Sequence, residues 1–219
     1  AVTGPCLPEF EGGAVVWFPE EFTWLLSCTN WFEADGLTEV RNVWGMNMAF
    51  RREAFDQAGL FSTAIGPYSA DESHGWSTLS AEETELSLRV RRVTGRRIVY
   101  NTKALVWQRV ERFKMSLRWI SRKSWLIGCE RGMMKRLYPE ESDILAQEYH
   151  LLHAIISRFL PNTLKLALRR PVDAWRRLRI AAVALFFVAF GYMYYRVRPL
   201  HTLQQTLLAG IPKRGSQEP

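Results

Sequence analysis

The sequence has little cysteine. Its three cysteines among 219 residues, Cys6, Cys28 and Cys129, lie far apart and form no C-x-x-C pair. A sparse, odd set argues against a disulfide framework and favours a reducing cytosol. Each cysteine is therefore expected to be a small, buried apolar side chain.

Several other signals are missing. No internal repeat and no low-complexity segment is present, and "AVTGPCLPEF" has neither the basic start nor the apolar stretch of a signal peptide. No helix-turn-helix, RRM or zinc pattern points to nucleic acid. Because the chain starts at Ala1 as if in mid-domain, we expect a fragment of a longer protein. With 47% hydrophobic and 23% charged residues, it can form one large domain or a domain with an appendage.

Acidic residues are scarce at the C-terminal end. Residues 160–219 hold ten Lys and Arg but only two acids, Asp173 and Glu218, and so carry +8. Since the whole chain carries +7, the remainder carries −1. Such a concentrated basic zone indicates an anionic partner surface, either nucleic acid or membrane.

An uncharged apolar run follows within this basic zone. Residues 180–195 include no charge, and arginines flank both ends. As a helix the run would cover about 24 Å, short of a hydrocarbon core of about 30 Å. We expect a membrane-associated helix, preceded by a basic segment suited to anionic lipid. A buried hairpin helix or a dimer contact is the rival interpretation. Deleting residues 179–219 is expected to leave the preceding domain intact.

Short strands and helices mix in the first half of the chain, and only helices follow. This order predicts an α/β domain over residues 1–137 and a helical, membrane-associated extension over 138–219. The expected helices cover residues 19–28, 51–59, 81–93, 115–136 and 141–159. The expected strands are residues 40–50, interrupted by Gly45, and the segments "RRIVYN" and "KALVWQRV".

Three carboxylates crowd the start of the helix expected over residues 81–93. Ser80 and Glu83 fit the S-x-x-E capping box, and Glu82 would gain from the helix dipole. Helix capping needs only one of these acids. The alternative is that one of the group, which also includes Glu85, acts as a general base at a cleft.

The order of motifs resembles the second half of family 2 nucleotide-sugar glycosyltransferases. The similarity covers roughly residues 2–132 and rests on "GMNMAFRREAFDQAGLF" followed by "EETELSLRVRRVTGRRIVYNTKALVWQRV". It implies the C-terminal half of a Rossmann-like glycosyltransferase domain of the A-type fold. It also implies an inverting transfer of sugar from a nucleotide-sugar donor to a hydroxyl acceptor.

The resemblance assigns roles to individual residues. Glu83 would be the general base, and Glu82 would orient the site or bind a sugar hydroxyl. Gly45 and Asn47 would line the floor near the donor sugar.

Two tryptophans, Trp44 and Trp76, are candidates to stack on sugar faces. Plain core packing is an equal alternative for each of them, since nine tryptophans cannot all bind sugar.

Two departures from the family pattern bear on metal and donor binding. The usual aspartate base is Glu83 here, and the usual histidine of the last strand is Gln108, a neutral amide not expected to bind metal. The D-x-D motif would precede Ala1, so the main ligands of a divalent cation, Mg²⁺ or Mn²⁺, are expected outside this chain. The chain alone is expected to bind a nucleotide sugar weakly.

The expected partners follow from the same resemblance. They are a nucleotide-sugar donor, a glycan or lipid-linked acceptor, and membrane lipid at the cytoplasmic face, with no nucleic acid. The rival hypothesis is a non-catalytic, basic membrane- or nucleic-acid-binding module.

Two weaker candidate pairs remain. His150 and His153 share a helix face as a metal pair would, but no third ligand is evident, and a solvated or packed pair is favoured. Arg118 and Arg122 could meet a diphosphate, although a solvated basic face is favoured. No metal ligand is therefore assigned within the chain.

Overall fold

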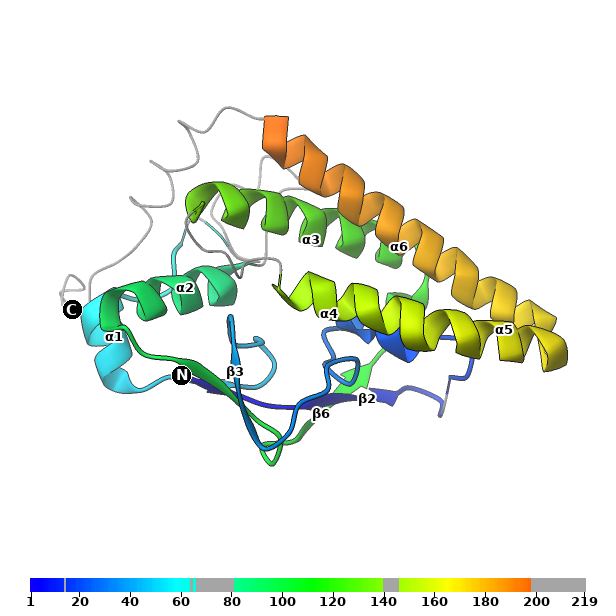
Figure 1. Cartoon of the computed structure of the whole chain (residues 1–219), viewed down its shortest axis with the longest axis horizontal. Helices are drawn as coiled ribbons and strands as arrows, with labels where there is room; N and C mark the ends of the chain where they lie inside the picture. Colours follow the sequence, from blue (N-terminus) through cyan, green and yellow to red (C-terminus); the bar gives the residue numbers. More distant parts are fainter. Residues whose placement is uncertain (14, 64, 66–80, 140–145, 198–219) are drawn as a thin grey trace.

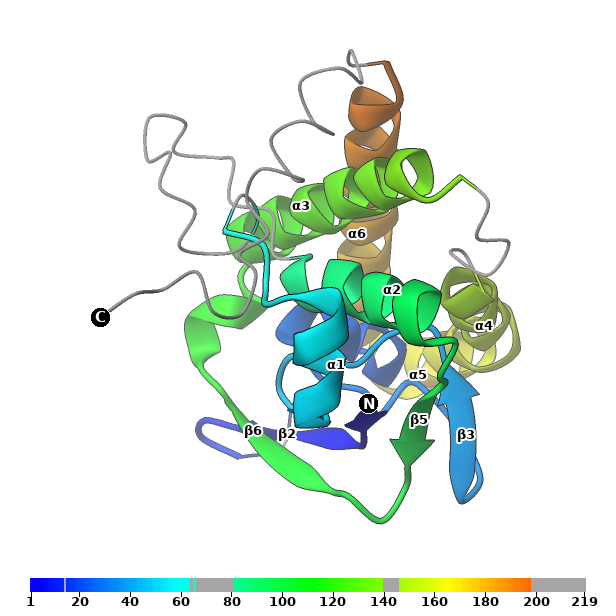
Figure 2. The same ribbon diagram turned by 90° about the vertical axis from the view of Figure 1, so that its left-hand side faces the viewer.

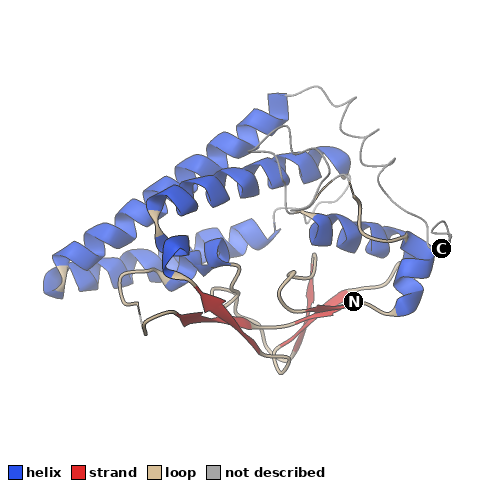
Figure 3. Cartoon of the chain, turned by 180° about the vertical axis from the view of Figure 1, so that it is seen from behind, coloured by secondary structure: helices blue, strands red, loops and turns tan. Residues whose placement is uncertain are grey.

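The computed structural model describes residues 1–13, 15–63, 65, 81–139 and 146–197. Strands form a layer on one side and helices cover that layer (Figures 1 and 3). The chain is therefore a mixed α/β structure, as expected from the mixture of short strands and helices in its first half.

The strands form two small sheets. The first has the order β3-β5-β1-β4, in which β1 and β5 are parallel while β3 and β4 run antiparallel to their neighbours. The second is the parallel pair β2 and β6, which continues the ribbon of β1 and β5 (Figure 2). The bounds are β1 Val2–Thr3, β2 Cys6–Phe10, β3 Leu37–Val40, β4 Met48–Ala49, β5 Ile98–Asn101 and β6 Val106–Val110.

The expected strand over residues 40–50 is wrong. The strand β3 ends at Val40, a turn follows, and Trp44 and Asn47 form only an isolated bridge before β4. Hydrogen bonds to Thr3, in strand β1, hold this turn. Trp44 N donates to Thr3 Oγ1 (3.2 Å), and Thr3 Oγ1 donates to Asn47 O (2.6 Å). These long-range contacts override the local preference for extended chain.

Two helices begin and end near the expected residues. Helix α1 covers Arg52–Ala58 and ends at Gly59, and helix α2 covers Glu82–Thr94. Helix α2 stops at Gly95, whose φ of +64° is a left-handed conformation that glycine adopts without steric cost. The expected capping box is not the start of α2, because the N-cap residue is Ala81, which has no side-chain cap. Ser80 lies outside the described residues.

The remaining helices form the layer above the strands. The 3₁₀ helix η1, in the segment expected to be helical, ends at Ser27, a left-handed residue. Helix α6 lies against both α3 and α5 (Figure 1). The bounds are η1 Glu20–Leu26, η3 Arg112–Met115, α3 Leu117–Leu137, α4 Ala146–Ala154, the π-helical η5 Ile155–Phe159, α5 Leu160–Arg169 and α6 Pro171–Val197.

The C-terminal helix belongs to the main hydrophobic core. Ile180, Ala181 and Ala184 of α6 are buried in the same cluster as Phe22 and Leu25 of η1. Removing residues 179–219 would expose this core, so the expectation that the deletion leaves the preceding domain intact is wrong. All three cysteines are free and buried, as expected.

Helix α6 is longer than the apolar run that the sequence defines. Its 27 residues include the whole of 180–195, and by length and composition it is the one described helix able to cross a membrane. Only 22% of its most apolar 18-residue window is buried. Much apolar side-chain surface of α6 is therefore open to a partner.

Candidate active site

A cavity of about 160 Å³ lies between the start of α2, helix η1 and the helices α3 and α6. Elements from distant parts of the sequence form its wall, and three of the nine tryptophans contribute to it. The lining residues are Trp24, Ser27, Cys28, Trp31, Asn42, Trp44, Met46, Glu83, Thr84, Lys123, Ile127, Glu130, Arg131, Leu151, Leu185 and Val188.

Glu83 contributes a carboxylate to this cavity and lies next to Gly45. A Cβ atom built on Gly45 would stand 3.7 Å from Glu83 Oε1, which is ordinary van der Waals distance. Ser87 joins the two segments: its hydroxyl donates to Glu83 O (2.6 Å) and accepts from Val43 N (3.2 Å). The turn and the first turn of α2 are thereby held together.

Burial changes the acidity of this carboxylate. It raises the pKa of Glu83 to about 8, with further contributions from the charges of Glu82 and Glu130. The Glu83 backbone N–H and the Lys123 ammonium act in the opposite direction. A carboxylate with a pKa this close to neutral is suited to accept and release a proton.

Glu82 is also perturbed, and burial is the main reason that its pKa is raised. Its Oε2 atom is buried and has no hydrogen-bond partner among the described residues. An unsatisfied buried polar atom is costly in a folded chain, and such atoms recur where a ligand completes the site.

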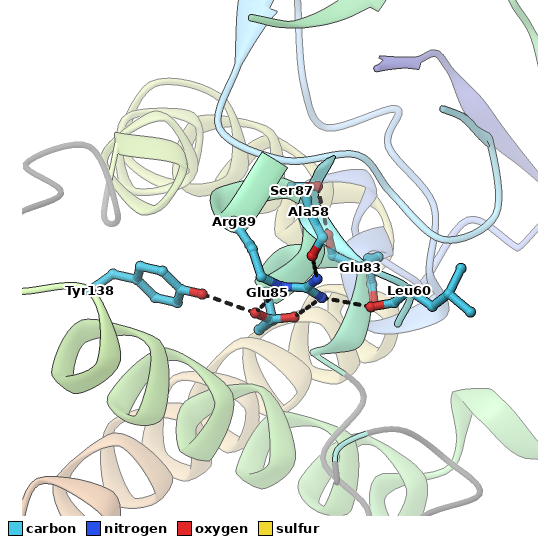
Figure 4. A network of polar contacts seen from close by, with 7 residues as sticks. All are labelled: Ala58, Leu60, Glu83, Glu85, Ser87, Arg89 and Tyr138. Carbon is cyan, nitrogen blue, oxygen red and sulfur yellow. Dashed lines mark hydrogen bonds and ion pairs between the residues drawn. The ribbon is translucent and has the colours of Figure 1, made fainter. Parts of the chain in front are cut away.

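Glu85 has a structural task instead. Its carboxylate forms a bidentate ion pair with Arg89 (2.8 Å to each oxygen) and accepts from Tyr138 Oη (3.0 Å). Arg89 also donates to the carbonyls of Ala58 and Leu60 (Figure 4). This network joins α1, α2 and the end of α3, so the three acids of the cluster have different environments.

The cavity has an aromatic wall made of Trp24, Trp31 and Trp44. The indole nitrogen of Trp24 is buried without a hydrogen-bond partner within the described ranges. Trp44, a predicted sugar-stacking residue, packs against the tilted ring of Phe32 and edge-on against the ring of Tyr100, each at 5.5 Å between centroids. It therefore both packs in the core and faces the cavity.

The other predicted residues lie elsewhere. Asn47 does not line the cavity; its amide donates to the carbonyls of Pro5 (3.1 Å) and Ala104 (2.5 Å), which ties the turn to two strand ends. Trp76 lies outside the described residues.

The residues of both weaker pairs are exposed and do not line the cavity. His150 is exposed and stands edge-on to the ring of Phe32, and Arg118 is exposed on α3. Gln108 pairs with Pro8 in the β2–β6 sheet. Among residues 1–13, 15–63, 65, 81–139 and 146–197, no group of three or more His, Cys, Asp or Glu side chains could hold a metal ion.

Sequence reasoning did not single out most of the polar and aromatic residues of the cavity, among them Trp24, Trp31, Lys123 and Glu130. Trp24 lies in an expected helix, and Lys123 and Glu130 lie in an expected basic helix, but nothing local indicates that these helices meet Glu83. The charge of Lys123, isolated between apolar residues on the helix face that bears Ile127, was the only available signal.

Comparison with known proteins identifies the class. Residues 20–195 match the family described as "Glycosyl transferase family group 2". The chain belongs to this glycosyltransferase family, as its motif order suggested.

A curated relative is more specific. The chain is 29% identical over 200 residues to the glucosyl-dolichyl phosphate glucuronosyltransferase of Haloferax volcanii, covering 91% of this chain and 61% of the relative. The chain thus spans about three fifths of the relative's length. No solved structure matches the chain.

Proposed function

We propose that this chain is the acceptor-side part of an inverting glycosyltransferase that moves a sugar from a nucleotide-sugar donor to a lipid-linked acceptor at the cytoplasmic face of a membrane. Residues 1–137 supply the acceptor-side part of the transferase domain, and residues 138–219 supply its helical extension. The donor-binding half and the main ligands of a divalent cation, Mg²⁺ or Mn²⁺, lie outside the chain.

One observation carries the proposal. Glu83, at the start of α2, and Leu185 and Val188, in the apolar part of α6, line the same cavity. A carboxylate that can take a proton therefore faces a helix with the composition of a membrane element. A substrate with a sugar hydroxyl at one end and a lipid chain at the other fits such a cavity.

The chemistry assigned to Glu83 is general base catalysis. The acceptor hydroxyl loses its proton to the Glu83 carboxylate as its oxygen forms a bond to the anomeric carbon of the donor sugar. The bond from that carbon to the diphosphate breaks on the opposite face, and the nucleoside diphosphate leaves with the electron pair. The configuration at the anomeric carbon is inverted because attack and departure occur on opposite faces.

Neighbouring residues assist in this proposal. Glu82, with its unsatisfied buried oxygen, binds a sugar hydroxyl, and Gly45 leaves room for the sugar beside Glu83. Trp44 supplies an apolar face for the sugar, and Trp76 is a second candidate for that task. Asn47 does not contact the sugar in this proposal. Its amide donates to two backbone carbonyls and so keeps the turn that contains Gly45 in position.

The described residues do not offer a metal site, so no step is assigned to a metal on this part of the enzyme. The name of the relative, which specifies a glucosyl-dolichyl phosphate acceptor and a glucuronosyl donor group, supports a sugar carried on an isoprenoid phosphate as the acceptor class.

A transfer assay with the full-length enzyme tests the proposal. Membranes that contain the enzyme are given a nucleotide sugar and a glucosyl isoprenoid phosphate, and the anomeric configuration of the product is read by NMR. We expect an inverted linkage on the lipid-linked sugar and much weaker transfer to the free sugar. A retained configuration, or equal transfer to the free sugar, would overturn the proposal.

A further inference from the structure

One side of helix α6 is occupied by the protein itself along its whole length. Its first half packs into the main core through Ile180, Ala181 and Ala184. Its second half lies against α3 with almost no space between the backbones: a Cβ on Gly191 would come 2.3 Å from Trp125 O, and one on Gly128 would come 2.2 Å from Val188 O. These contacts hold the middle and the second half of α6 on the domain.

The opposite side of α6 is a continuous apolar stripe. At 100° per residue its members fall on one face of the helix, and each exposes between 41% and 78% of its surface. We call this set the outer stripe of α6. It consists of Trp175, Leu178, Leu185, Phe186, Phe190, Met193 and Val197.

Helix α6 cannot cross a bilayer in this arrangement. The adjoining helix α3 carries Arg122, Lys123, Glu130, Arg131, Lys135 and Arg136. Each charged side chain costs roughly 2.5–3.5 kcal/mol at the centre of a membrane-spanning helix. Crossing would take this charged helix into the hydrocarbon, or would separate α6 from both α3 and the main core.

We propose that α6 is a half-embedded membrane helix: its outer stripe inserts into the surface of an anionic bilayer, while its inner side stays on the domain and both of its ends stay on the same side of the membrane. This inference deepens the proposed function and rests on its membrane location.

Charge supports a bilayer as the occupant of the stripe. The end of α5, the residue before α6 and the first turns of α6 carry five arginines against the single acid Asp173: Arg169, Arg170, Arg176, Arg177 and Arg179. Basic residues beside an apolar stripe are typical of helices that lie in an anionic interface. The preceding helix α5 adds exposed Leu164 (72%) and Leu168 (86%).

The position of the cavity also supports lipid rather than a second copy of the chain. Leu185 belongs to the outer stripe and also lines the cavity that holds Glu83. An apolar surface therefore continues from the stripe to the carboxylate. An acceptor anchored in the bilayer could bring its sugar to Glu83 while its chain stays beside Leu185.

Labelling from one side of sealed vesicles tests the topology. In the full-length enzyme, Arg170→Cys and Arg196→Cys place a thiol at the exposed ends of α6, and Leu37→Cys on β3 reports the side of the domain. The three cysteines of this chain are buried, and the full-length enzyme without an added cysteine, labelled in parallel, gives the background. A membrane-impermeant maleimide should label all three variants from the same side; labelling of Arg170→Cys and Arg196→Cys from opposite sides would overturn the proposal.

A charge placed on the stripe tests lipid contact directly. Phe186→Glu and Phe190→Glu should each weaken binding to phosphatidylcholine vesicles containing phosphatidylserine by about tenfold or more. Trp107→Glu, on exposed β6, is the matched control and should leave binding unchanged. Unchanged binding of both stripe variants, or a stripe variant that only converts a dimer to a monomer, would overturn the proposal. Because neither readout uses transfer activity, the topology and the proposed reaction can fail independently.

Discussion

The carboxylate of Glu83 and the backbone of Gly45 stand in direct van der Waals range, with 3.7 Å between Glu83 Oε1 and the place of a Gly45 Cβ. Gly45 is exposed and has no positive φ, so a side chain there would strain neither backbone nor core. It would instead lie beside the Glu83 carboxylate, next to the cavity residues Trp44 and Met46.

We expect Gly45→Leu to reduce transfer by roughly tenfold or more, because its side chain fills the approach to Glu83. Gly45→Ala, whose Cβ fits at ordinary distance, is the matched control and should keep most activity. Steady-state kinetics with the melting temperature of each variant separate blocked access from unfolding. Full activity of Gly45→Leu would mean that the substrate does not reach Glu83 past residue 45.

The acidity of Glu83 should be visible in the pH profile. The pKa of Glu83 is raised to about 8, and a general base acts when deprotonated, so kcat/KM should increase with pH through that region. Because Lys123 lowers this pKa, Lys123→Met should shift the rise to higher pH. A profile that is flat between about pH 6 and pH 9, with the same shape in both enzymes, would contradict the assignment.

The Glu85–Arg89 pair should matter for stability. Their side chains are only 4% and 11% exposed, and removing one partner of a buried pair costs about 3–5 kcal/mol. Arg89→Met should therefore lower the free energy of unfolding by that amount in denaturant titrations. Arg97→Met is the control. It breaks an exposed pair with Glu39, whose side chains are 78% and 45% exposed, and should change the free energy of unfolding by less than about 1 kcal/mol. Equal effects would refute the structural role of Glu85.

The backbone contact between α3 and α6 should not tolerate a side chain at Gly191. In Gly191→Ala the new Cβ would meet Trp125 O at 2.3 Å, and the helices must separate. Such overpacking costs about 1–3 kcal/mol. Ala189→Leu, on the exposed side of the same helix, should leave thermal stability nearly unchanged. If both variants unfold alike, α6 does not pack on α3 as described.

Local signals predicted several elements well. Gly59 and Gly95 end α1 and α2 where their sequence position indicates, because glycine accepts the conformation required after a helix. The strands β5 and β6 fall within the predicted apolar segments. Glu83 was found as a candidate from its motif, and the structure places it in a cavity.

Other features depend on contacts between distant segments and could not be predicted. The turn after Val40 is held by Thr3, more than 35 residues away, and reads as a strand when taken alone. Trp31 and Lys123 reach the cavity only because the segment after η1 and helix α3 come together beside the start of α2. The run 180–195 within helix α6 is apolar all round in sequence, yet its two sides have different surroundings in the fold.

Replacement of Glu83 by glutamine tests the central claim most directly. The amide keeps the shape of the side chain but cannot accept the acceptor proton, so transfer by the full-length enzyme should fall by about 10²–10⁴-fold. The melting temperature should not fall, because burying a neutral amide costs less than burying a carboxylate. Glu83→Gln with near wild-type transfer would contradict the account and leave Glu83 as an ordinary residue at the start of a helix.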